Sequence, residues 1–359
     1  MPFRLKAEAT KESAVRMRAL VLATLLITAI VAADHLLAQS PAPGNAPRAA
    51  ASAPVPRTPW GHPDLQGTWD YKTITPLERP AQYGDRQFLT DEEAKALEER
   101  AGKRMDEPPS DEQPNQSGTI HATYLTDPGR RVDDDRRTSL IVDPPDGRVP
   151  ALVNAGAGAG GRGGRGGRGG GGAARPGGRA DSWLDRSLLE RCITWGIPTA
   201  SLPGLYNNNI QIVQSPDHVV IVHEMVHDAR VIPLDGRPRV TGKGTNTRNY
   251  LGESRGWFEG DTLVVETTNF GTRTNYRGAN VNLKLTERYR RVNANRVELL
   301  LTVDDPTVWT KPWTVKLGMR PSEGDLVEYA CHEGNYGLRN ILEVARDEEK
   351  AAAGAAGQK

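Results

Sequence analysis

The segment His223-Glu224-Met225-Val226-His227 matches the HExxH motif of zinc hydrolases. In those enzymes a helix places the two histidines one turn apart, so both imidazoles bind one zinc ion while the glutamate activates water. One interpretation of the chain is therefore a zinc-dependent hydrolase with His223 and His227 as metal ligands. This chemistry requires that the motif be helical.

The residues that flank the motif favour strands instead. β-Branched side chains are dense on both sides, at residues 219–222 and 231–232, and such side chains prefer extended backbone. We predict strands over residues 218–226 and 229–232. On a strand the two histidines would lie roughly 13 Å apart, too far for two zinc–nitrogen bonds of about 2.1 Å. The pattern therefore favours a chain without a metal site or cofactor.

The same segment offers acid/base chemistry without a metal. On an extended chain one face would carry Glu224, Asp228 and Arg230, and the other would carry His223, His227 and Val231. A carboxylate beside an arginine can clamp a ligand or act as a general base. A solvated ion pair across two strands is the alternative.

A second group of candidates lies near the C-terminus. His332 and Glu333 could form an acid/base pair at a barrel mouth, although a disulfide at Cys331 followed by a turn at Gly334 explains this segment without catalysis. Aromatic rings could stack on a ligand or pack in the core. The candidates for ligand binding are Trp257, Trp309, Trp313 and Tyr329.

The first 38 of the 359 residues resemble an export signal. A basic start precedes an apolar run at residues 19–33, which is short for a membrane span, and an uncleaved anchor is the alternative. Export to the periplasm or the medium predicts that Cys192 and Cys331 form a disulfide rather than two free thiols. The net charge of +1 gives no reason to expect nucleic acid as a partner.

Composition divides the rest of the chain. Residues 39–58 form a Pro/Ala-rich linker, 156–180 a flexible Gly/Arg-rich insertion and 346–359 a disordered tail. Between the spacers, residues 59–155 are the N-terminal part of the domain, with a surface helix over 91–105 opened by a capping box at Thr90. Residues 181–345 form the main body, and the apolar spacing in residues 182–195 predicts an amphipathic helix.

The body is predicted to be mainly β. Successive strands without intervening helices are best satisfied by an antiparallel up-and-down barrel with a few peripheral helices, and a β-sandwich is the alternative. Apolar residues alternate at Val297, Leu299, Leu301 and Val303, which gives one buried face. The predicted strands span residues 209–214, 218–226, 229–232, 262–268, 281–292, 296–303, 313–317 and 326–331, with a short one at 139–143.

Several motifs look familiar. Gly67-Thr68-Trp69 resembles the G-x-W at the start of the first strand of lipocalins and other calycins. The segments 61–69, 139–150, 224–230, 256–262 and 328–336 together look like an uncharacterised family of secreted bacterial β-rich proteins. This resemblance implies export and a β-rich fold, and it brings no reaction or catalytic residue.

These observations predict an exported barrel that binds a small organic molecule in its cavity. The alternatives are a small-molecule lyase, isomerase or hydrolase that uses acid/base residues at the barrel mouth, the zinc hydrolase, and a structural envelope protein. The sequence does not specify the oligomeric state.

Overall fold

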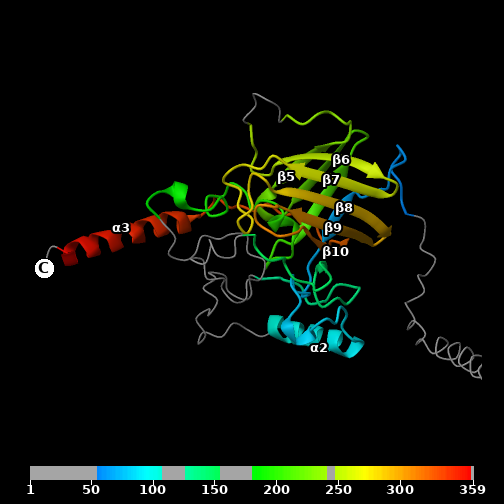
Figure 1. Ribbon diagram of the computed structural model, residues 1–359, viewed down its shortest axis with the longest axis horizontal. Helices are drawn as coiled ribbons and strands as arrows, with labels where there is room; N and C mark the ends of the chain where they lie inside the picture. The colour runs from blue at the N-terminus through cyan, green and yellow to red at the C-terminus, as the bar shows by residue number, and fades with distance from the viewer. Residues whose placement is uncertain (1–54, 107–125, 154–179, 241–246, 357–359) are drawn as a thin grey trace, which may run out of the picture. The chain divides into compact units, whose positions relative to one another are not determined.

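Ten antiparallel strands form one sheet that is nearly closed into a barrel (Figure 1). The computed structural model describes residues 55–106, 126–153, 180–240 and 247–356, which belong to one compact unit, Ser52–Lys359. The strands are β1 (Gly67–Asp70), β2 (Ile141–Asp143), β3 (Asn209–Gln214), β4 (His218–His223), β5 (Ala229–Pro233), β6 (Glu253–Glu259), β7 (Thr262–Thr268), β8 (Lys284–Asn293), β9 (Arg296–Asp304) and β10 (Trp313–Pro321).

The strand order confirms the predicted up-and-down barrel. Around the sheet it is β5-β4-β3-β1-β10-β9-β8-β7-β6, and β2 adds to β10. Neighbours along this path are also mostly neighbours in sequence, as in a meander. The two end strands, β5 and β6, lie close together without a ladder of hydrogen bonds, so a seam runs between them.

Glycine at position 256 lets the two edges of the seam approach. A Cβ atom there would lie 2.8 Å from Leu234 Cδ2 and 2.9 Å from Ile232 Cγ2. A side chain at position 256 would therefore require Ile232 and Leu234 to shift. The absence of a Cβ atom at Gly256 lets these two side chains pack against β6.

Inward-facing apolar side chains fill the barrel. In β9 the residues alternate between buried and half-buried, with Val297, Leu299, Leu301 and Val303 inside. They belong to one continuous core together with Trp69, Leu285, Trp313 and Val315. The period of two along β8, β9 and β10 therefore produces the closed sheet that the sequence predicts.

The two described α-helices lie outside the barrel (Figure 1). The predicted surface helix is confirmed as α2 (Asp91–Asp106), and its capping box forms: Thr90 N donates to Glu93 Oε2 at 2.9 Å, and Glu93 N donates to Thr90 Oγ1 at 3.2 Å. None of the described helices is long and apolar enough to cross a membrane. The remaining helices are η1 (Ala81–Tyr83), η3 (Trp183–Asp185), η4 (Thr199–Ser201), η5 (Met225–His227) and α3 (Tyr336–Ala356).

Three local predictions are wrong, and one strand was not predicted. Residues 182–195 form capped turns rather than a helix, because Ser182 and Asp185 cap η3 and the Glu190 side chain binds Ser187 N. Residues 326–331 form no strand, and this segment is instead tied to the loop at Cys192 by the disulfide of Cys331. The predicted strand at 218–226 ends at His223, and β6 was not predicted because its residues do not alternate in polarity.

The predicted spacers fall mostly outside the described residues. These are the export signal (1–38), the linker (39–58) except residues 55–58, and the insertion (156–180) except residue 180. Residues 346–356, which the sequence places in an irregular tail, belong to α3. The N-terminal part of the domain contributes β1 and β2 to the sheet, so the barrel is not confined to residues 181–345.

Candidate functional site

The HExxH segment is a hairpin turn between β4 and β5. The strand ends at His223, whose backbone N–H donates to Asp228 O at 2.9 Å. Val226 and His227 adopt left-handed backbone, with φ of 59° and 53°. The histidines separate: His223 is buried in the barrel, whereas His227 Nδ1 accepts a hydrogen bond from Tyr329 N at 3.1 Å. The helix that zinc chemistry needs does not form here.

The turn also changes which side chains share a face. On one continuous strand His223 and Arg230 would point to opposite sides, but both point into the barrel. Arg230 pairs with Ile221 across the hairpin, so His223 is its diagonal neighbour on the inner wall. Val231 points outward and is 62% exposed. The predicted division of this segment into two faces is therefore wrong.

A buried ion pair crosses the barrel interior. Arg230 on β5 donates two hydrogen bonds to Glu287 on β8, at 2.6 and 2.8 Å. Tyr289 OH donates to Glu287 Oε1 at 2.7 Å. Burial alone would raise the pKa of Glu287, but the Arg230 charge leaves it below its usual value. Glu287 is 0% exposed and Arg230 4% exposed, so the pair is shielded from solvent.

His223 is a neutral group beside this pair. Its Nδ1 lies 2.8 Å from Ala200 O, and since a carbonyl oxygen can only accept, Nδ1 carries the proton. Tyr71 OH donates to the same carbonyl at 2.7 Å. Burial, together with the positive charge of Arg230, lowers the pKa of His223 to about 3. Its Nε2 has no hydrogen-bond partner among the described residues.

Asp228 closes the turn before β5 and is only half satisfied. Its Oδ2 accepts hydrogen bonds from Thr194 Oγ1 at 2.6 Å, Trp195 N at 2.9 Å and Gly196 N at 3.3 Å. Its Oδ1 accepts none from the described residues and is not sealed from solvent. Burial raises the pKa of Asp228, and the three donors and Arg230 offset part of that rise.

A cavity of about 340 Å³ lies at the seam. We call it the seam cavity, and its polar lining residues are Thr194, Asp228, Arg230, Asn249, Tyr250 and Ser254. A second cavity of about 260 Å³, the loop cavity, shares Thr194 and Tyr250 with it. Asp228 and Arg230 are therefore the two predicted site residues that the structure brings to one cavity.

The other candidates lie elsewhere. Glu224 is buried at the turn and accepts a hydrogen bond from Asn209 Nδ2 at 2.7 Å. His332 and Glu333 are exposed on the C-terminal segment. They do not line the seam cavity or the loop cavity.

The aromatic candidates are also dispersed. Trp309 and Trp313 pack edge to face in the core, with ring centroids 5.9 Å apart. Trp257 is exposed and donates to Glu259 Oε1, while Tyr329 is half-buried beside His227. None of the four lines the seam cavity. The structure therefore gives these rings packing and surface positions rather than places in the cavity wall.

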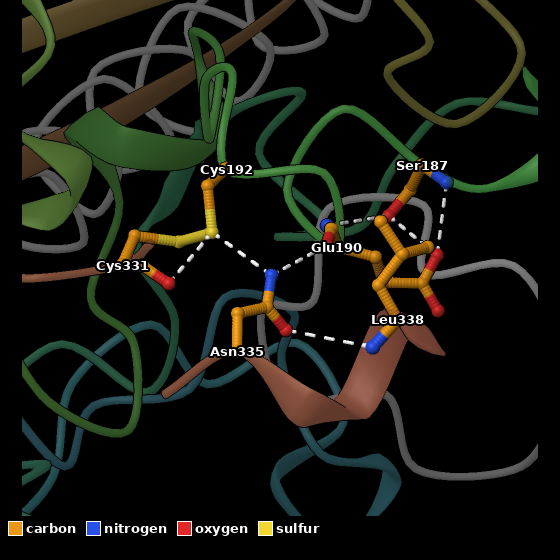
Figure 2. The surroundings of a disulfide bond; sticks show 6 residues. All are labelled: Ser187, Glu190, Cys192, Cys331, Asn335 and Leu338. Carbon is orange, nitrogen blue, oxygen red and sulfur yellow. Dashed lines mark hydrogen bonds between the residues drawn. A yellow bond between two sulfur atoms is a disulfide. The ribbon is translucent and has the colours of Figure 1, made fainter. Parts of the chain in front are cut away.

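The predicted disulfide is confirmed. Cys192 and Cys331 are bonded, with Cα atoms 5.6 Å apart, and Asn335 Nδ2 lies 3.2 Å from both Cys192 Sγ and Glu190 O (Figure 2). The bond anchors the C-terminal segment to the loop that supplies Thr194 to the seam cavity. It thereby supports the wall that holds Asp228. A disulfide is compatible with an exported protein.

Several residues of the site were not predicted. Thr194, Tyr250 and Ser254 lie in the cavity wall, and Glu287 neutralises Arg230. One signal in the sequence could have indicated Glu287. It lies two residues after Leu285, so it shares the face of the strand that carries the apolar side chains. A charge in such a position requires a buried partner.

The chain matches no protein-family model and no curated protein. The chemistry of the site therefore has to be inferred from its geometry. The seam cavity combines one half-satisfied carboxylate, one neutralised arginine and several uncharged polar groups. No group of three or more His, Cys, Asp or Glu side chains arranged to hold a metal ion occurs among the described residues. This arrangement suits recognition of a small molecule by hydrogen bonds.

Proposed function

We propose that the protein is an exported barrel that binds a small polar organic molecule in the seam cavity. The observation that carries this proposal is the state of Asp228. Its carboxylate is held in the cavity wall by three hydrogen bonds on one oxygen, and the other oxygen remains free to accept a bond from a ligand. Because Oδ1 is not sealed from solvent, a ligand donor can replace water there, and its hydrogen bond to the carboxylate would be charge-assisted and therefore strong.

The dimensions of the cavity fit this role. Its volume of about 340 Å³ lies at the small end of ligand sites, which run from about 300 to 1,000 Å³. It opens between β5 and β6, where strands are not joined by a ladder of hydrogen bonds. A ligand can therefore enter at the seam without breaking the sheet. The buried Arg230–Glu287 pair below it makes the inner wall rigid.

The test is a screen for binders followed by a blocked variant. Ligand-observed NMR of the oxidised protein with a library of small polar molecules should find compounds that bind. Ala229→Trp should abolish their binding, because Ala229 lines the seam cavity and a tryptophan there would fill it. Val213→Trp is the matched control, since Val213 is a strand residue that is 46% exposed and does not line the cavity.

The outcomes separate clearly. Binding that survives Ala229→Trp would place the ligand elsewhere and overturn the proposal. A library screen without any binder to wild type would overturn it as well. Loss of binding in Val213→Trp to the same extent would show that the effect is not specific to the cavity.

A second candidate function is acid/base catalysis on a bound small molecule. Asp228 supports it, because burial raises the pKa of a carboxylate that already faces a cavity. Such a group can take or give a proton close to neutral pH more readily than an ordinary aspartate. Turnover of the NMR binders by wild type and by Asp228→Asn is the test. Equal rates, or the absence of any turnover by wild type, would leave binding as the function.

A further inference from the structure

The charges at the seam cavity do not balance. The charge of Arg230 is paired, since both of its terminal nitrogens donate to Glu287. Asp228 has no such ion-pair partner among the described residues: its three donors are a hydroxyl and two backbone N–H groups. The formal charges of Asp228, Arg230 and Glu287 therefore sum to one negative charge when Asp228 is ionised.

The free oxygen of Asp228 is also oriented. Three hydrogen bonds from residues 194–196 fix Oδ2, so the carboxylate cannot rotate without breaking them. Asp228 is 7% exposed, and its Oδ1 is the atom left for a ligand in the cavity wall. A charged donor would form a bond about twice as strong as a neutral one at this position.

An aromatic ring completes the site. Tyr250 lines both the seam cavity and the loop cavity and is 40% exposed. The face of a tyrosine ring attracts a cation within about 6 Å of its centre. A carboxylate and a tyrosine in one small cavity form a common setting for an ammonium group, whereas an anion would meet the negative charge of Asp228.

We propose that the seam cavity binds the ammonium group of a small organic amine, with Asp228 Oδ1 as its counter-ion and acceptor. This inference rests on the proposed function and names the ligand class for the same cavity. A cation there would remove the cost of an unpaired buried carboxylate. Burial raises the pKa of Asp228 in the protein alone, and a bound ammonium group would reverse that effect.

The experiment compares three probes of nearly equal shape. Benzylamine, benzyl alcohol and benzoate differ mainly in charge, and their binding to the oxidised full chain can be measured by calorimetry at pH 7. We expect benzylamine to bind at least about tenfold more tightly than benzyl alcohol, and benzoate not to bind. In Asp228→Asn the preference for the amine should disappear.

A matched variant controls for the loss of one negative charge. Asp325→Asn makes the same chemical change at an exposed residue that lines a different surface hollow, beside Gly67 and Arg291. The amine preference should persist in this variant. If Asp325→Asn and Asp228→Asn lower it equally, the preference reflects net charge, and the inference is wrong.

The remaining outcomes distinguish this inference from the proposed function. Equal binding of the three probes, or tightest binding of benzoate, would overturn the amine assignment and leave ligand binding at the seam intact. If no probe binds while library compounds bind and are blocked by Ala229→Trp, the amine assignment again fails alone. If neither probes nor library compounds bind to wild type, both fail.

Discussion

Two buried carboxylates in this barrel differ in how completely they are satisfied. Both oxygens of Glu287 accept hydrogen bonds, from Arg230 and Tyr289. Only one oxygen of Asp228 does so. Burial acts on both groups in the same direction, yet the pKa of Glu287 lies below its usual value and that of Asp228 above it. The partner therefore decides the charge state, and burial alone does not.

This difference gives the two carboxylates different roles: Glu287 stabilises the fold, and Asp228 is available to bind a ligand. The charges of Glu287 and Arg230 are already paired and buried, so these two residues serve as a brace across the interior. A half-satisfied carboxylate beside a cavity can still accept a bond. Changes at Glu287 should therefore act on stability, and changes at Asp228 should act on binding.

Breaking the brace should have the largest effect. Glu287→Gln would leave the Arg230 charge buried without a counter-ion and weaken the bond from Tyr289. We expect the free energy of unfolding to fall by about 5 kcal/mol, the upper end for a broken buried pair. Urea denaturation measures the change.

An exposed pair provides the control for that experiment. Glu259 pairs with Arg288, and their side chains are 47% and 37% exposed. Glu259→Gln should lower the free energy of unfolding far less than Glu287→Gln, because surface ion pairs contribute little. Similar losses in the two variants would contradict the role of Glu287 as a brace.

His223, beside the brace, should make stability depend on pH. Its pKa is lowered from 6.5 to about 3 by burial. As the pH falls from 6.5 towards 3, the unfolded chain gains a proton that the folded chain does not, so stability decreases. Across this window the loss from His223 should be about 4 kcal/mol.

The slope of stability against pH tests this. Between pH 6.5 and 4, the stability of His223→Gln should change less with pH than that of the wild type, whatever its absolute stability. His332→Gln is the control, because it makes the same substitution at an exposed residue outside the barrel. If the stability of His223→Gln depends on pH as steeply as that of the wild type, His223 is protonated in the folded protein.

The disulfide should contribute less than the brace. Its cysteines are separated by 139 residues, and disulfides typically stabilise by about 3 kcal/mol. The double variant Cys192→Ser/Cys331→Ser should lose about this much in urea denaturation. It should also bind ligands more weakly, because the loop that holds Asp228 loses its anchor.

Reduction of the wild type provides an independent comparison. The free energy of unfolding of the double variant should be the same with and without a reducing agent. That of the wild type should fall on reduction to the value of the double variant. Unchanged wild-type stability after complete reduction would show that hydrogen bonds of Asn335 hold the segment without the bond.

The barrel could be predicted from the sequence because its signals are local. Alternation of Val297, Leu299 and Leu301 specifies a buried face, and short turns specify which strands are neighbours. These features need no information from distant residues. The same holds for the capping box at Thr90.

The site could be predicted only in part because its contacts are not local. The partner of Arg230 is 57 residues away, and the donors to Asp228 come from a loop more than 30 residues earlier. The turn at Val226 and His227 uses left-handed backbone without glycine, which no local signal indicates. The prediction of a continuous extended segment through that turn therefore places His223 and Arg230 on opposite faces, whereas both point into the barrel.

The smallest effect on stability, with opposite sign, is expected at Asp228. The folded pKa of Asp228 is above the unfolded value of 3.8, so ionisation at neutral pH weakens the fold. Asp228→Asn keeps an oxygen for Thr194, Trp195 and Gly196 and removes the buried charge. It should therefore stabilise the protein slightly, by no more than about 1 kcal/mol, while the preference for an amine ligand is lost.

Measurement at two pH values makes this result specific. The stability gain of Asp228→Asn should be present at pH 7 and should vanish as the pH falls below the folded pKa, because Asp228 is then neutral in both states. A purely structural aspartate would instead lose stability on substitution. Greater stability together with a lost preference for an amine ligand would show that the free carboxylate oxygen is retained at a cost to the fold, as a binding site requires.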